Sequence, residues 1–312
     1  MGEFDLIRRY FQRPAAAGVD VGVGDDCAVL VPTPGMRWLV SSDMLVEGRH
    51  FLSTVDPARL GHKALAVNLS DLAACGAAPR GFTLALALPR IDEAWLAGFA
   101  RGLWALADAS ACPLIGGDTT QGPLNICITV FGEAPPGQVL LRGGARVGDD
   151  IWVSGRLGDA RLALEVFRGR VALQGDGFTQ VRAAMECPTP RLALGQALRG
   201  IATAAIDLSD GLIGDLGHIL QASGVGARVD VDALPRSAVL AAQPAALQRQ
   251  CLLAGGDDYE LVFTAPPGAR LPSSSVALTR IGVIEATAGL CVVDARGAAV
   301  EHGLRSFDHF KP

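Results

Sequence analysis

The chain is 312 residues long, half of its residues are hydrophobic, and its formal net charge is −5 at pH 7. The length fits two domains of ordinary size. The acidic balance, without a basic stripe between aromatic residues, argues against nucleic acid as a partner. No apolar run is long enough to cross a bilayer, which argues against a membrane protein. The opening stretch MGEFDLIRRYFQRP mixes acids and arginines in an amphipathic pattern, which predicts a surface helix and not a signal peptide.

Hydrophobic periodicity predicts the elements of the first half. It predicts helices over residues 3–12, from Asp56-Pro57 to Gly76, and over 92–109, and strands over 27–31, 37–42, 81–88 and 124–133. The strand over 37–42 is expected to end in Ser41-Ser42-Asp43, and Gly116 to Thr120 are expected to form a turn between two strands. Residues 1–135 therefore predict an α+β sandwich, with a seam at Pro135-Pro136-Gly137.

The second half predicts an α/β domain. Its expected elements are a strand over 151–154, helices over 158–168 and 189–200, a strand running into Asp207, a helix ending at Ser223, and a strand over 261–264 that directly follows Gly255-Gly256-Asp257-Asp258-Tyr259-Glu260. The end of the chain, SFDHFKP, predicts a loose tail. We expect the domains to be residues 1–137 and 138–312. The alternating apolar strands over 82–88 and 124–130 either fill a core or pair with a partner.

Seven cysteines are scattered along the chain without a Cys-x-x-Cys pair. They are Cys27, Cys75, Cys112, Cys127, Cys187, Cys251 and Cys291. This pattern favours reduced thiols in a cytoplasmic protein over a disulfide framework or a zinc site. Cys27 follows two aspartates, so it is either a reactive thiol or a buried cysteine of a strand, and we expect the buried strand.

One carboxylate lies within a stretch that predicts a buried helix. Ala64–Pro79 is apolar almost all the way round, which is typical of a helix buried on every side. Asp71 lies in its middle, and the nearest lysine, Lys63, lies two turns earlier on a different face. Because burying an unpaired charge is expensive, Asp71 either bonds to backbone groups or binds a cation.

Further aspartates occur in small-residue segments that we expect to be turns at strand ends or helix starts. They are Asp25, Asp26, Asp43, Asp118, Asp207, Asp210, Asp257 and Asp258. A single turn aspartate commonly bonds to its own backbone. Carboxylates gathered in one place repel one another unless a cation neutralises them. Hard oxygen ligands select Mg²⁺, Ca²⁺ or Mn²⁺ over zinc, and scattered single aspartates fit magnesium with phosphate ligands better than a compact calcium loop.

Phosphate is therefore the expected ligand, although the sequence has no Gly-x₄-Gly-Lys-[Ser/Thr] segment and no kinase-type lysine strand. Such a site handles phosphate charge through metals and Gly/Ser turns. Arg142, which precedes two glycines, either adds a positive fork for phosphate or is a surface arginine.

Taken together, these segments resemble the thiamine-monophosphate kinases, a family of the ATP-binding superfamily that includes aminoimidazole ribonucleotide synthetase. The resemblance covers essentially the whole chain. It rests on Gly24-Asp-Asp-Cys-Ala28, Ser41-Ser-Asp43, Glu47-Gly-Arg-His-Phe51, Asn68-Leu-Ser-Asp71, Gly116-Gly-Asp-Thr119, Ile206-Asp-Leu-Ser-Asp-Gly-Leu212, Gly255-Gly-Asp-Asp-Tyr-Glu-Leu261 and Phe307-Asp-His-Phe310.

The resemblance implies an α+β N-terminal domain that pairs into a dimeric β-barrel, a C-terminal α/β domain, and ATP in the cleft between the two domains. It implies several Mg²⁺ ions at Asp26, Ser41, Ser42, Asp43, Asp71, Asp118, Asp207 and Asp210. It implies ATP contacts at Gly117, Asp118, Arg142 and Ser209, and thiamine phosphate contacts at His50, Asp257 and Phe307. The family often has Glu where Asp257 stands, and Tyr or Trp where Phe307 stands.

The implied reaction transfers the γ-phosphate of ATP to thiamine monophosphate, the last step of thiamine diphosphate biosynthesis. The phosphate nucleophile is already ionised near neutral pH, so we expect no catalytic general base. Magnesium would remove the repulsion between the two polyanions. We expect Phe307 to stack on the aromatic ring and Asp257 to face the cationic or amino side. His50 either contacts the substrate phosphate or is a solvated loop histidine.

Sister enzymes and a non-catalytic regulator are the rivals. Selenophosphate synthetase uses Cys or selenocysteine in a flexible glycine-rich segment, whereas Cys27 is predicted in a strand. The hydrogenase maturation factor needs a C-terminal cysteine, whereas this chain ends in Phe310-Lys311-Pro312. Aminoimidazole ribonucleotide synthetase stays open as a runner-up. A metal-dependent nucleotide-binding regulator needs fewer acidic ligands than this chain carries.

Overall fold

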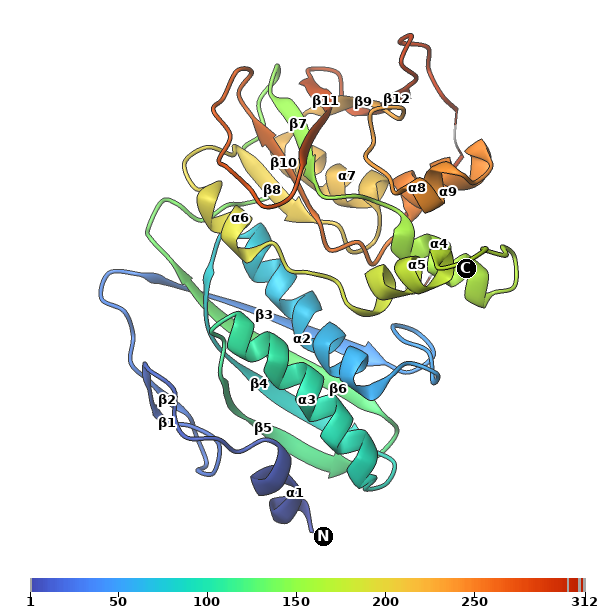
Figure 1. The fold of residues 1–312 in the computed structure, drawn as a ribbon. Coiled ribbons are helices and arrows are strands. Elements are labelled where there is room, and N and C mark those ends of the chain that lie inside the picture. The colour runs from blue at the N-terminus through green and yellow to red at the C-terminus, as the bar shows by residue number, and fades with distance from the viewer. Residues whose placement is uncertain (1, 302, 308–309, 311–312) are drawn as a thin grey trace. The chain divides into compact units, whose positions relative to one another are not determined.

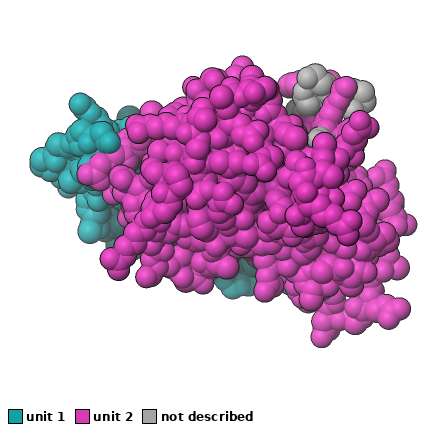
Figure 2. Space-filling view, turned by 90° about the horizontal axis from the view of Figure 1, so that it is seen from above, with its two compact units in different colours: residues 1–72, 77–137 teal, residues 73–76, 138–312 magenta. Residues whose placement is uncertain are grey.

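The computed structural model describes residues 2–301, 303–307 and 310. The chain divides into two compact units, the first of residues 1–72 and 77–137 and the second of residues 73–76 and 138–312 (Figures 1 and 2). In the described part of the chain, no helix combines the length and the apolar character needed to span a membrane. All seven cysteines are described, and none of them forms a disulfide.

The first unit is a four-stranded sheet with two long helices on one face (Figure 1). Its elements are α1 (Glu3–Tyr10), β1 (Val19–Val21), β2 (Val29–Leu30), β3 (Arg37–Val46), α2 (Pro57–Ala74), β4 (Ala78–Leu88), α3 (Glu93–Ala109), β5 (Leu114–Gln121) and β6 (Asn125–Ala134). The strand order is β3-β6-β4-β5, in which only the β4–β5 pair is parallel. The sheet is open, with β3 and β5 at its edges in the described chain.

The two faces of this sheet differ in exposure, and side chains that alternate along each strand point to opposite faces. Phe82 and Leu84 of β4 and Ile128 of β6 are buried on the face that the helices cover. These strands therefore fill a core. On the opposite face, Val40 and Met44 of β3 are 59% and 54% exposed. One face is thus apolar and buried, and the other is apolar and exposed.

Two predicted strand ends were wrong. β3 continues through Ser41-Ser42-Asp43 to Val46, and β5 contains the whole of Gly116 to Thr120. Ser, Gly and Asp are typical turn residues, but pairing with β6 and β4 overrides that local preference. Gly117 has φ +149° and lies so close to β4 that an added Cβ would stand 1.9 Å from the oxygen of Leu84. Asp43 and Asp118 are therefore mid-strand residues.

The predicted strand over 27–31 shrinks to Val29–Leu30, and Cys27 lies exposed in the bend before it. The expectation of a buried strand cysteine was wrong. The preceding aspartates bend the chain, since the Asp25 side chain accepts a hydrogen bond from the backbone nitrogen of Asp26 at 2.8 Å. The placement of Cys27 in a strand therefore no longer argues against a selenophosphate synthetase.

The second unit is built on a six-stranded sheet of order β12-β9-β11-β7-β10-β8, in which only the β12–β9 pair is parallel. Its elements are β7 (Asp150–Ser154), α4 (Asp159–Phe167), α5 (Gly177–Glu186), α6 (Leu192–Ala197), β8 (Ala204–Asp207), α7 (Leu212–Ser223), β9 (Gly226–Asp230), α8 (Ala238–Ala241), α9 (Ala245–Ala254), β10 (Leu261–Ala265), β11 (Leu278–Glu285) and β12 (Gly289–Val293).

Both faces of this sheet are packed. Val153 and Val262 belong to one large apolar cluster with residues of α4 and α7, whereas Phe263 belongs to a second cluster with Leu194 of α6 and Ala73 of α2. The last turn of α2 thus lies in the second unit. Helix α5 was not predicted, and the helix predicted over 189–200 is only Leu192–Ala197. Its late start fits Pro190, because a proline disfavours the helical conformation of the residue before it.

Candidate active site

Helix α2 positions the first group of candidate residues. The Asp56 carboxylate caps its start by accepting hydrogen bonds from the backbone nitrogens of Ala58, at 2.9 Å, and Arg59, at 3.2 Å. Gly76, with φ +66°, follows its end. Leu65 and Leu69 are completely buried, so the helix is held by apolar packing on most of its surface. Its polar residues are thereby fixed in place.

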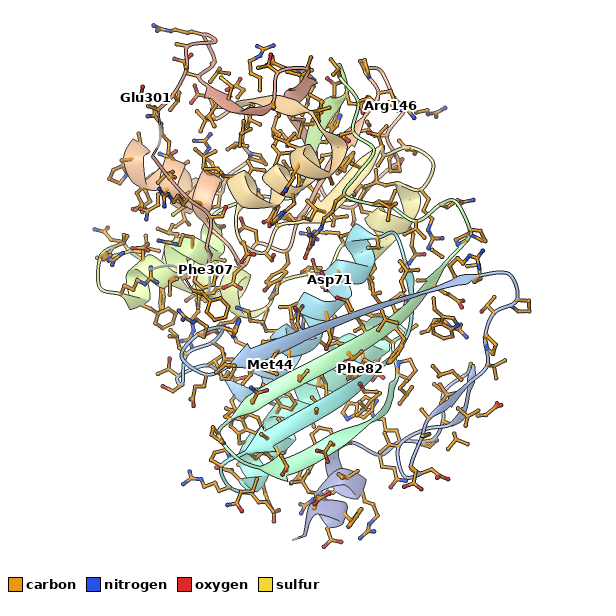
Figure 3. The ribbon with its side chains drawn as sticks, turned by 180° about the vertical axis from the view of Figure 1, so that it is seen from behind. Met44, Asp71, Phe82, Arg146, Glu301 and Phe307 are labelled. Carbon is orange, nitrogen blue, oxygen red and sulfur yellow. The ribbon has the colours of Figure 1, made fainter. Side chains whose placement is uncertain are left out.

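Asp71 of α2 meets the covered face of β3 (Figure 3). The hydroxyl of Ser41 donates a hydrogen bond of 2.5 Å to Asp71 Oδ2. Two residues after Ser41 in β3, the backbone nitrogen of Asp43 donates to Oδ1 of Asn68, which lies one turn before Asp71 in α2, at 3.0 Å. Ser41, Asp43 and Asp71 are thus brought close to one another. The Ser41 hydroxyl is one partner of the Asp71 carboxylate, a side chain of another element and not a backbone group. Cation binding by Asp71 stays a prediction.

Ser42 and Asp118 lie on the other face of the same sheet. Ser42 bonds to the carbonyl oxygen of Ile128 at 3.1 Å and lies 2.9 Å from the Thr129 hydroxyl. Asp118 is in register with Ala85 and, across β6, with Met44. Because residues in register share a face, Asp118 belongs to the exposed face. The structure therefore separates these two residues from Ser41, Asp43 and Asp71.

Asp26 lies exposed in the bend after β1, and no hydrogen bond between described residues joins it to Ser41, Asp43 or Asp71. Gly117 lies beside Asp118 in β5, as its tight approach to β4 requires. Of the residues predicted to bind metal or ATP in the described first unit, three are thus brought together by the contacts between β3 and α2.

His50 lies in a compact turn directly after β3. The backbone nitrogens of Arg49 and His50 donate to the oxygen of Val46, and Gly48, with φ +77°, donates to the oxygen of Phe51. The ring atom Nδ1 of His50 accepts a hydrogen bond of 3.0 Å from the backbone nitrogen of Val46. The neutral imidazole therefore carries its proton on Nε2, which is suited to donate to a phosphate oxygen.

In the second unit, two segments pair to form the next group. Asp207 ends β8 and is 5% exposed, and its neighbours pair with the segment before β10. Leu208 donates to the oxygen of Glu260 at 2.8 Å, and Asp257 donates to the oxygen of Ser209 at 2.9 Å. The segments Asp207–Gly211 and Gly255–Glu260 are thus joined by backbone hydrogen bonds.

The two paired segments approach each other closely at Gly256, and two neighbouring residues have a strained backbone. A Cβ added to Gly256 would stand 2.3 Å from the oxygen of Ser209. Asp257 and Tyr259 both have positive φ, +67° and +50°, a conformation that non-glycine residues adopt mainly where the surrounding structure imposes it, often at functional sites. The Tyr259 hydroxyl bonds to Asp257 Oδ1 at 3.2 Å, which orients that carboxylate.

The end of the described chain joins the same group. The backbone nitrogen of Phe307, which is labelled in Figure 3, donates to the oxygen of Asp210 at 3.2 Å. Phe307 is 45% exposed. Asp207, Ser209, Asp210, Asp257 and Phe307 are therefore brought together within the second unit. Asp308 and His309 of the tail motif lie outside the described residues.

Arg142 is not part of this group. Its carbonyl oxygen accepts a bond of 3.4 Å from Ser223, the last residue of α7, whereas Asp210 lies before the first turn of that helix. A helix of 12 residues is ~18 Å long, so the backbones of Arg142 and Ser209 lie at opposite ends of α7. Gly117 and Asp118 lie in the first unit, so the four predicted ATP contacts do not form one cluster within either unit.

Asp215 is a residue of this region that was not predicted from the sequence. Its carboxylate accepts hydrogen bonds from the backbone nitrogens of Asp210, at 3.1 Å, and Gly211, at 3.0 Å, so it fixes the loop that presents Asp210. Burial, together with the nearby charge of Asp210, raises the pKa of Asp215 to about 7. An acid in the first turn of a helix was the available signal, since the unpaired amides of that turn attract carboxylates.

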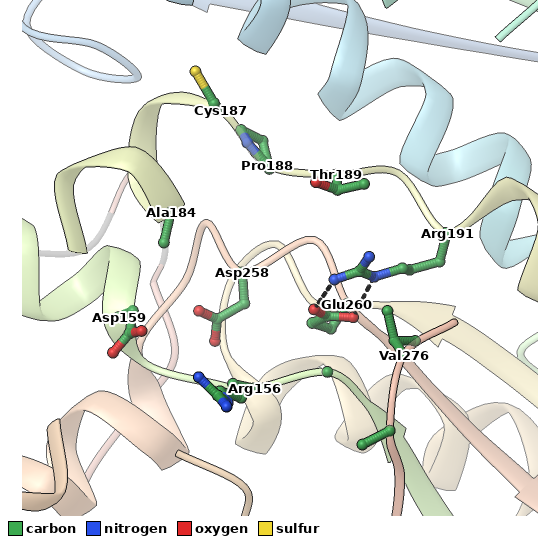
Figure 4. Close-up of a pocket in the computed structure, with 12 residues that line it drawn as sticks. Arg156, Asp159, Ala184, Cys187, Pro188, Thr189, Arg191, Asp258, Glu260 and Val276 are labelled. Atoms are coloured by element: carbon green, nitrogen blue, oxygen red, sulfur yellow. Dashed lines mark hydrogen bonds and ion pairs between the residues drawn. The ribbon is translucent and has the colours of Figure 1, made fainter. Parts of the chain in front are cut away.

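Asp258 and Glu260 have structural partners at a pocket of about 380 Å³ in the second unit (Figure 4). Both carboxylate oxygens of Asp258 accept from the backbone nitrogen of Gly158, at 2.9 and 3.0 Å, and burial raises the Asp258 pKa well above its usual range. Glu260 pairs with Arg191 through two hydrogen bonds and accepts from Ser154. In this segment, Asp257 is thus the acid that lies beside Ser209.

The donors of both groups are carboxylates and hydroxyls, the hard oxygen ligands that magnesium prefers. Among the residues that the structure describes, no group of three or more His, Cys, Asp or Glu side chains is arranged to hold a metal ion. In the first unit, β3 and α2 carry one set of donors, and in the second unit another set lies around Asp207 and Asp210. Their chemistry fits magnesium with phosphate as a further ligand better than a metal caged by protein alone.

The sequence matches the models of two known protein domains. The model of the AIR synthase related protein N-terminal domain matches residues 24–134, and that of the C-terminal domain matches residues 146–295. The chain belongs to the AIR synthase related family, which confirms the predicted class of fold.

Within this class the similarity is specific and covers the whole chain. The chain is 47% identical to the thiamine-monophosphate kinase of Salmonella typhimurium, over 99% of the chain and 98% of the relative. It is 44% identical to the crystal structure of thiamine-monophosphate kinase from Stenotrophomonas maltophilia, with a TM-score of 0.85 over 91% and 93% of the two chains. AaThiL, solved with AMPPCP and TMP, is 30% identical, with a TM-score of 0.80 over 92% and 91%. The chain is a member of the thiamine-monophosphate kinase family.

Proposed function

We propose that this chain transfers the γ-phosphate of ATP to thiamine monophosphate, which gives thiamine diphosphate and ADP and completes thiamine diphosphate biosynthesis. The observation that carries the proposal is the full-length relationship to thiamine-monophosphate kinases, one of which was solved with an ATP analogue and TMP. The clustering of Asp207, Asp210 and Asp257 with an exposed aromatic ring supports it.

Magnesium would be held by the carboxylates and hydroxyls, and when bound it supplies the positive charge that lets two polyanions approach. In the first unit the proposed ligands are Asp26, Ser41, Ser42, Asp43, Asp71 and Asp118. In the second unit they are Asp207 and Asp210. The hydrogen bonds to Asp71 from Ser41 and to Asp215 from the backbone of Asp210 hold two of these residues in place. The number of donors supports several ions.

The remaining proposed contacts bind and orient the two substrates. Gly117, Asp118, Arg142 and Ser209 would contact ATP. His50 would donate from Nε2 to the phosphate of thiamine monophosphate, because Val46 occupies Nδ1. Asp257, oriented by Tyr259, would face the cationic or amino side of the substrate, and the exposed ring of Phe307 would stack on its aromatic ring. No general base is needed, since the attacking phosphate oxygen is already ionised.

The exposed face of the four-stranded sheet supports a homodimer. Along β3, Trp38, Val40, Met44 and Val46 are 41%, 59%, 54% and 38% exposed. A row of large apolar side chains on one face is typical of an interface. We propose that two copies pair through this face into a β-barrel, which makes residues 1–137 the nucleotide-binding and dimerisation domain and 138–312 the α/β domain. Seven thiols without a disulfide support a cytoplasmic location.

The test is a direct assay with Mg-ATP and thiamine monophosphate, followed by chromatography of the products. We expect thiamine diphosphate and ADP in equal amounts, and none when EDTA removes the magnesium. ATP binding without product favours a nucleotide-binding regulator or a sister enzyme such as aminoimidazole ribonucleotide synthetase. The absence of thiamine diphosphate would overturn the proposed activity, whichever of these two explanations holds.

A further inference from the structure

A buried lysine lies beneath the turn that carries His50. Lys63 belongs to α2 and is only 3% exposed. Its ammonium group donates a hydrogen bond of 3.1 Å to the carbonyl oxygen of His50. Burying an ammonium is expensive unless hydrogen bonds compensate. One of the interactions that compensate this buried charge therefore depends on the position of the His50 backbone.

The His50 turn is held from both of its sides. From the strand side, the backbone nitrogen of Val46 bonds to Nδ1 and its oxygen accepts from the nitrogens of Arg49 and His50. From the helix side, Lys63 holds the His50 carbonyl. The imidazole and the peptide group of the same residue are thus fixed by different elements. Together these bonds make Nε2 the ring nitrogen that carries the proton.

We propose that Lys63 is a positioning residue for the phosphate of thiamine monophosphate. Its buried ammonium fixes the turn at residues 46–51, and this turn presents the Nε2–H of His50 to the phosphate. The inference rests on the proposed function and adds to it a residue that contacts His50 and not the reacting atoms. A charge-assisted hydrogen bond is about twice as strong as a neutral one, which suits an element that must hold a loop in one conformation.

Lysine suits this place for a chemical reason. Arginine supplies all but two of the 27 basic residues of the chain, and Lys63 is one of the two exceptions. An ammonium is a compact group that directs up to three donors at close acceptors, whereas a guanidinium is a wide planar fork. A buried site beneath a carbonyl favours the compact group.

The kinetic test compares Lys63→Met with Leu60→Ala. Methionine keeps the length and apolar body of the side chain but removes the donor and the charge. We expect the KM for thiamine monophosphate to rise about tenfold, as for loss of one charge-assisted contact, while the KM for ATP changes less than about twofold. Leu60, 1% exposed and one turn earlier in α2, controls for lost stability. Its alanine variant should melt at a lower temperature with both KM values unchanged.

A spectroscopic test does not depend on activity. In ¹⁵N-labelled protein, the ring nitrogens of His50, assigned by comparison with His50→Gln, should show a single tautomer with the proton on Nε2. In Lys63→Met the shifts should move toward the average of the two tautomers, because the turn no longer holds Nδ1 against Val46. Lys63→Gln, which keeps an amide donor without the charge, repeats both measurements if the methionine variant does not fold.

The double variant Lys63→Met/His50→Ala completes the design. If Lys63 acts through His50, adding Lys63→Met to His50→Ala should raise the KM for thiamine monophosphate no further. Additive effects would overturn the inference, as would unchanged His50 shifts or equal changes in both KM values. Absence of thiamine diphosphate with the wild-type chain would instead refute the proposed function, and the shifts of His50 would still test whether Lys63 holds the turn.

Discussion

The two groups of candidate residues are held by different physical means. In the first unit, Ser41, Asp43 and Asp71 lie inside regular elements, a strand and a buried helix, and side-chain alternation decides which of them meet. In the second unit, Ser209, Asp210 and Asp257 lie in two irregular segments that hydrogen-bond to each other, one of which contains residues with positive φ. The first group depends on element packing, and the second depends on close backbone approach.

This difference predicts which substitutions each group tolerates. In the first group, an isosteric change of a side chain should remove chemistry without disturbing the fold. In the second group, one methyl group on the backbone should move several candidate residues at once.

The largest effect is expected from Asp71→Asn or Asp43→Asn. Each variant loses the negative charge of a proposed magnesium ligand, and in Asp71→Asn the amide oxygen of the new side chain can still accept from Ser41. Because a bound metal supplies several kcal/mol of charge stabilisation, kcat should fall by about 10³-fold while the thermal melt stays near that of the wild type. Asp108→Asn is the matched control, since Asp108 pairs with Arg13 on the surface. Near-wild-type rates with an unchanged magnesium requirement would contradict this prediction.

The second effect concerns Gly256→Ala. The new methyl group would overlap the oxygen of Ser209, so the two paired segments must move apart. A displacement of about 1 Å at a reacting group reduces rates by about 10²-fold, and overpacking should lower stability by about 1–3 kcal/mol. Steady-state kinetics and urea unfolding measure both quantities.

Gly217→Ala is the control for this variant, because Gly217 lies within α7 and an added Cβ meets no atom within 4 Å. Alanine is the better helix former, so this control should be neutral or more stable by up to about 1 kcal/mol. If Gly256→Ala behaved like Gly217→Ala, the close approach of the two segments would not matter for the site.

Sequence reasoning found the residues of both groups better than it found their surroundings. The buried helix with Asp71, its start at Pro57 and the family motifs could be read directly, because periodicity and capping are local signals. The ends of β3 and β5 could not, since Ser-Ser-Asp and Gly-Gly-Asp have turn propensity and only strand pairing reveals their true state. The separation of Asp118 from Asp43 follows from register, which is a property of the folded sheet.

The third effect is expected from Phe307→Ala, which should raise the KM for thiamine monophosphate about tenfold, as for loss of one aromatic stacking contact. The KM for ATP should change much less. Phe307→Tyr keeps the ring and should bind substrate like the wild type. Equal increases in both KM values would show that the variant disturbs the Asp210 loop, to which the backbone of Phe307 bonds, and would count against stacking.

The smallest effect on turnover is expected from Asp258→Asn, which should change the pH dependence of stability. Burial raises the pKa of Asp258 in the folded chain above 3.8, its usual value. Between these two pKa values the folded state binds more protons than the unfolded state, so the free energy of unfolding falls as the pH rises from about 4. The asparagine in this variant can still accept from Gly158 but cannot ionise, so the stability of the variant should fall less over this range.

Urea unfolding at a series of pH values from about 4 upward measures this difference, with kcat at neutral pH measured in parallel. The two curves should lie closest at low pH, where the Asp258 carboxyl is protonated, and should separate as the pH rises. Asp159 remains in both proteins, and burial also raises its pKa, so part of the slope should survive in the variant. Parallel curves would show that Asp258 ionises with its ordinary pKa. A large loss of kcat would show that Asp258, in addition to the proposed Asp257, contributes to the reaction.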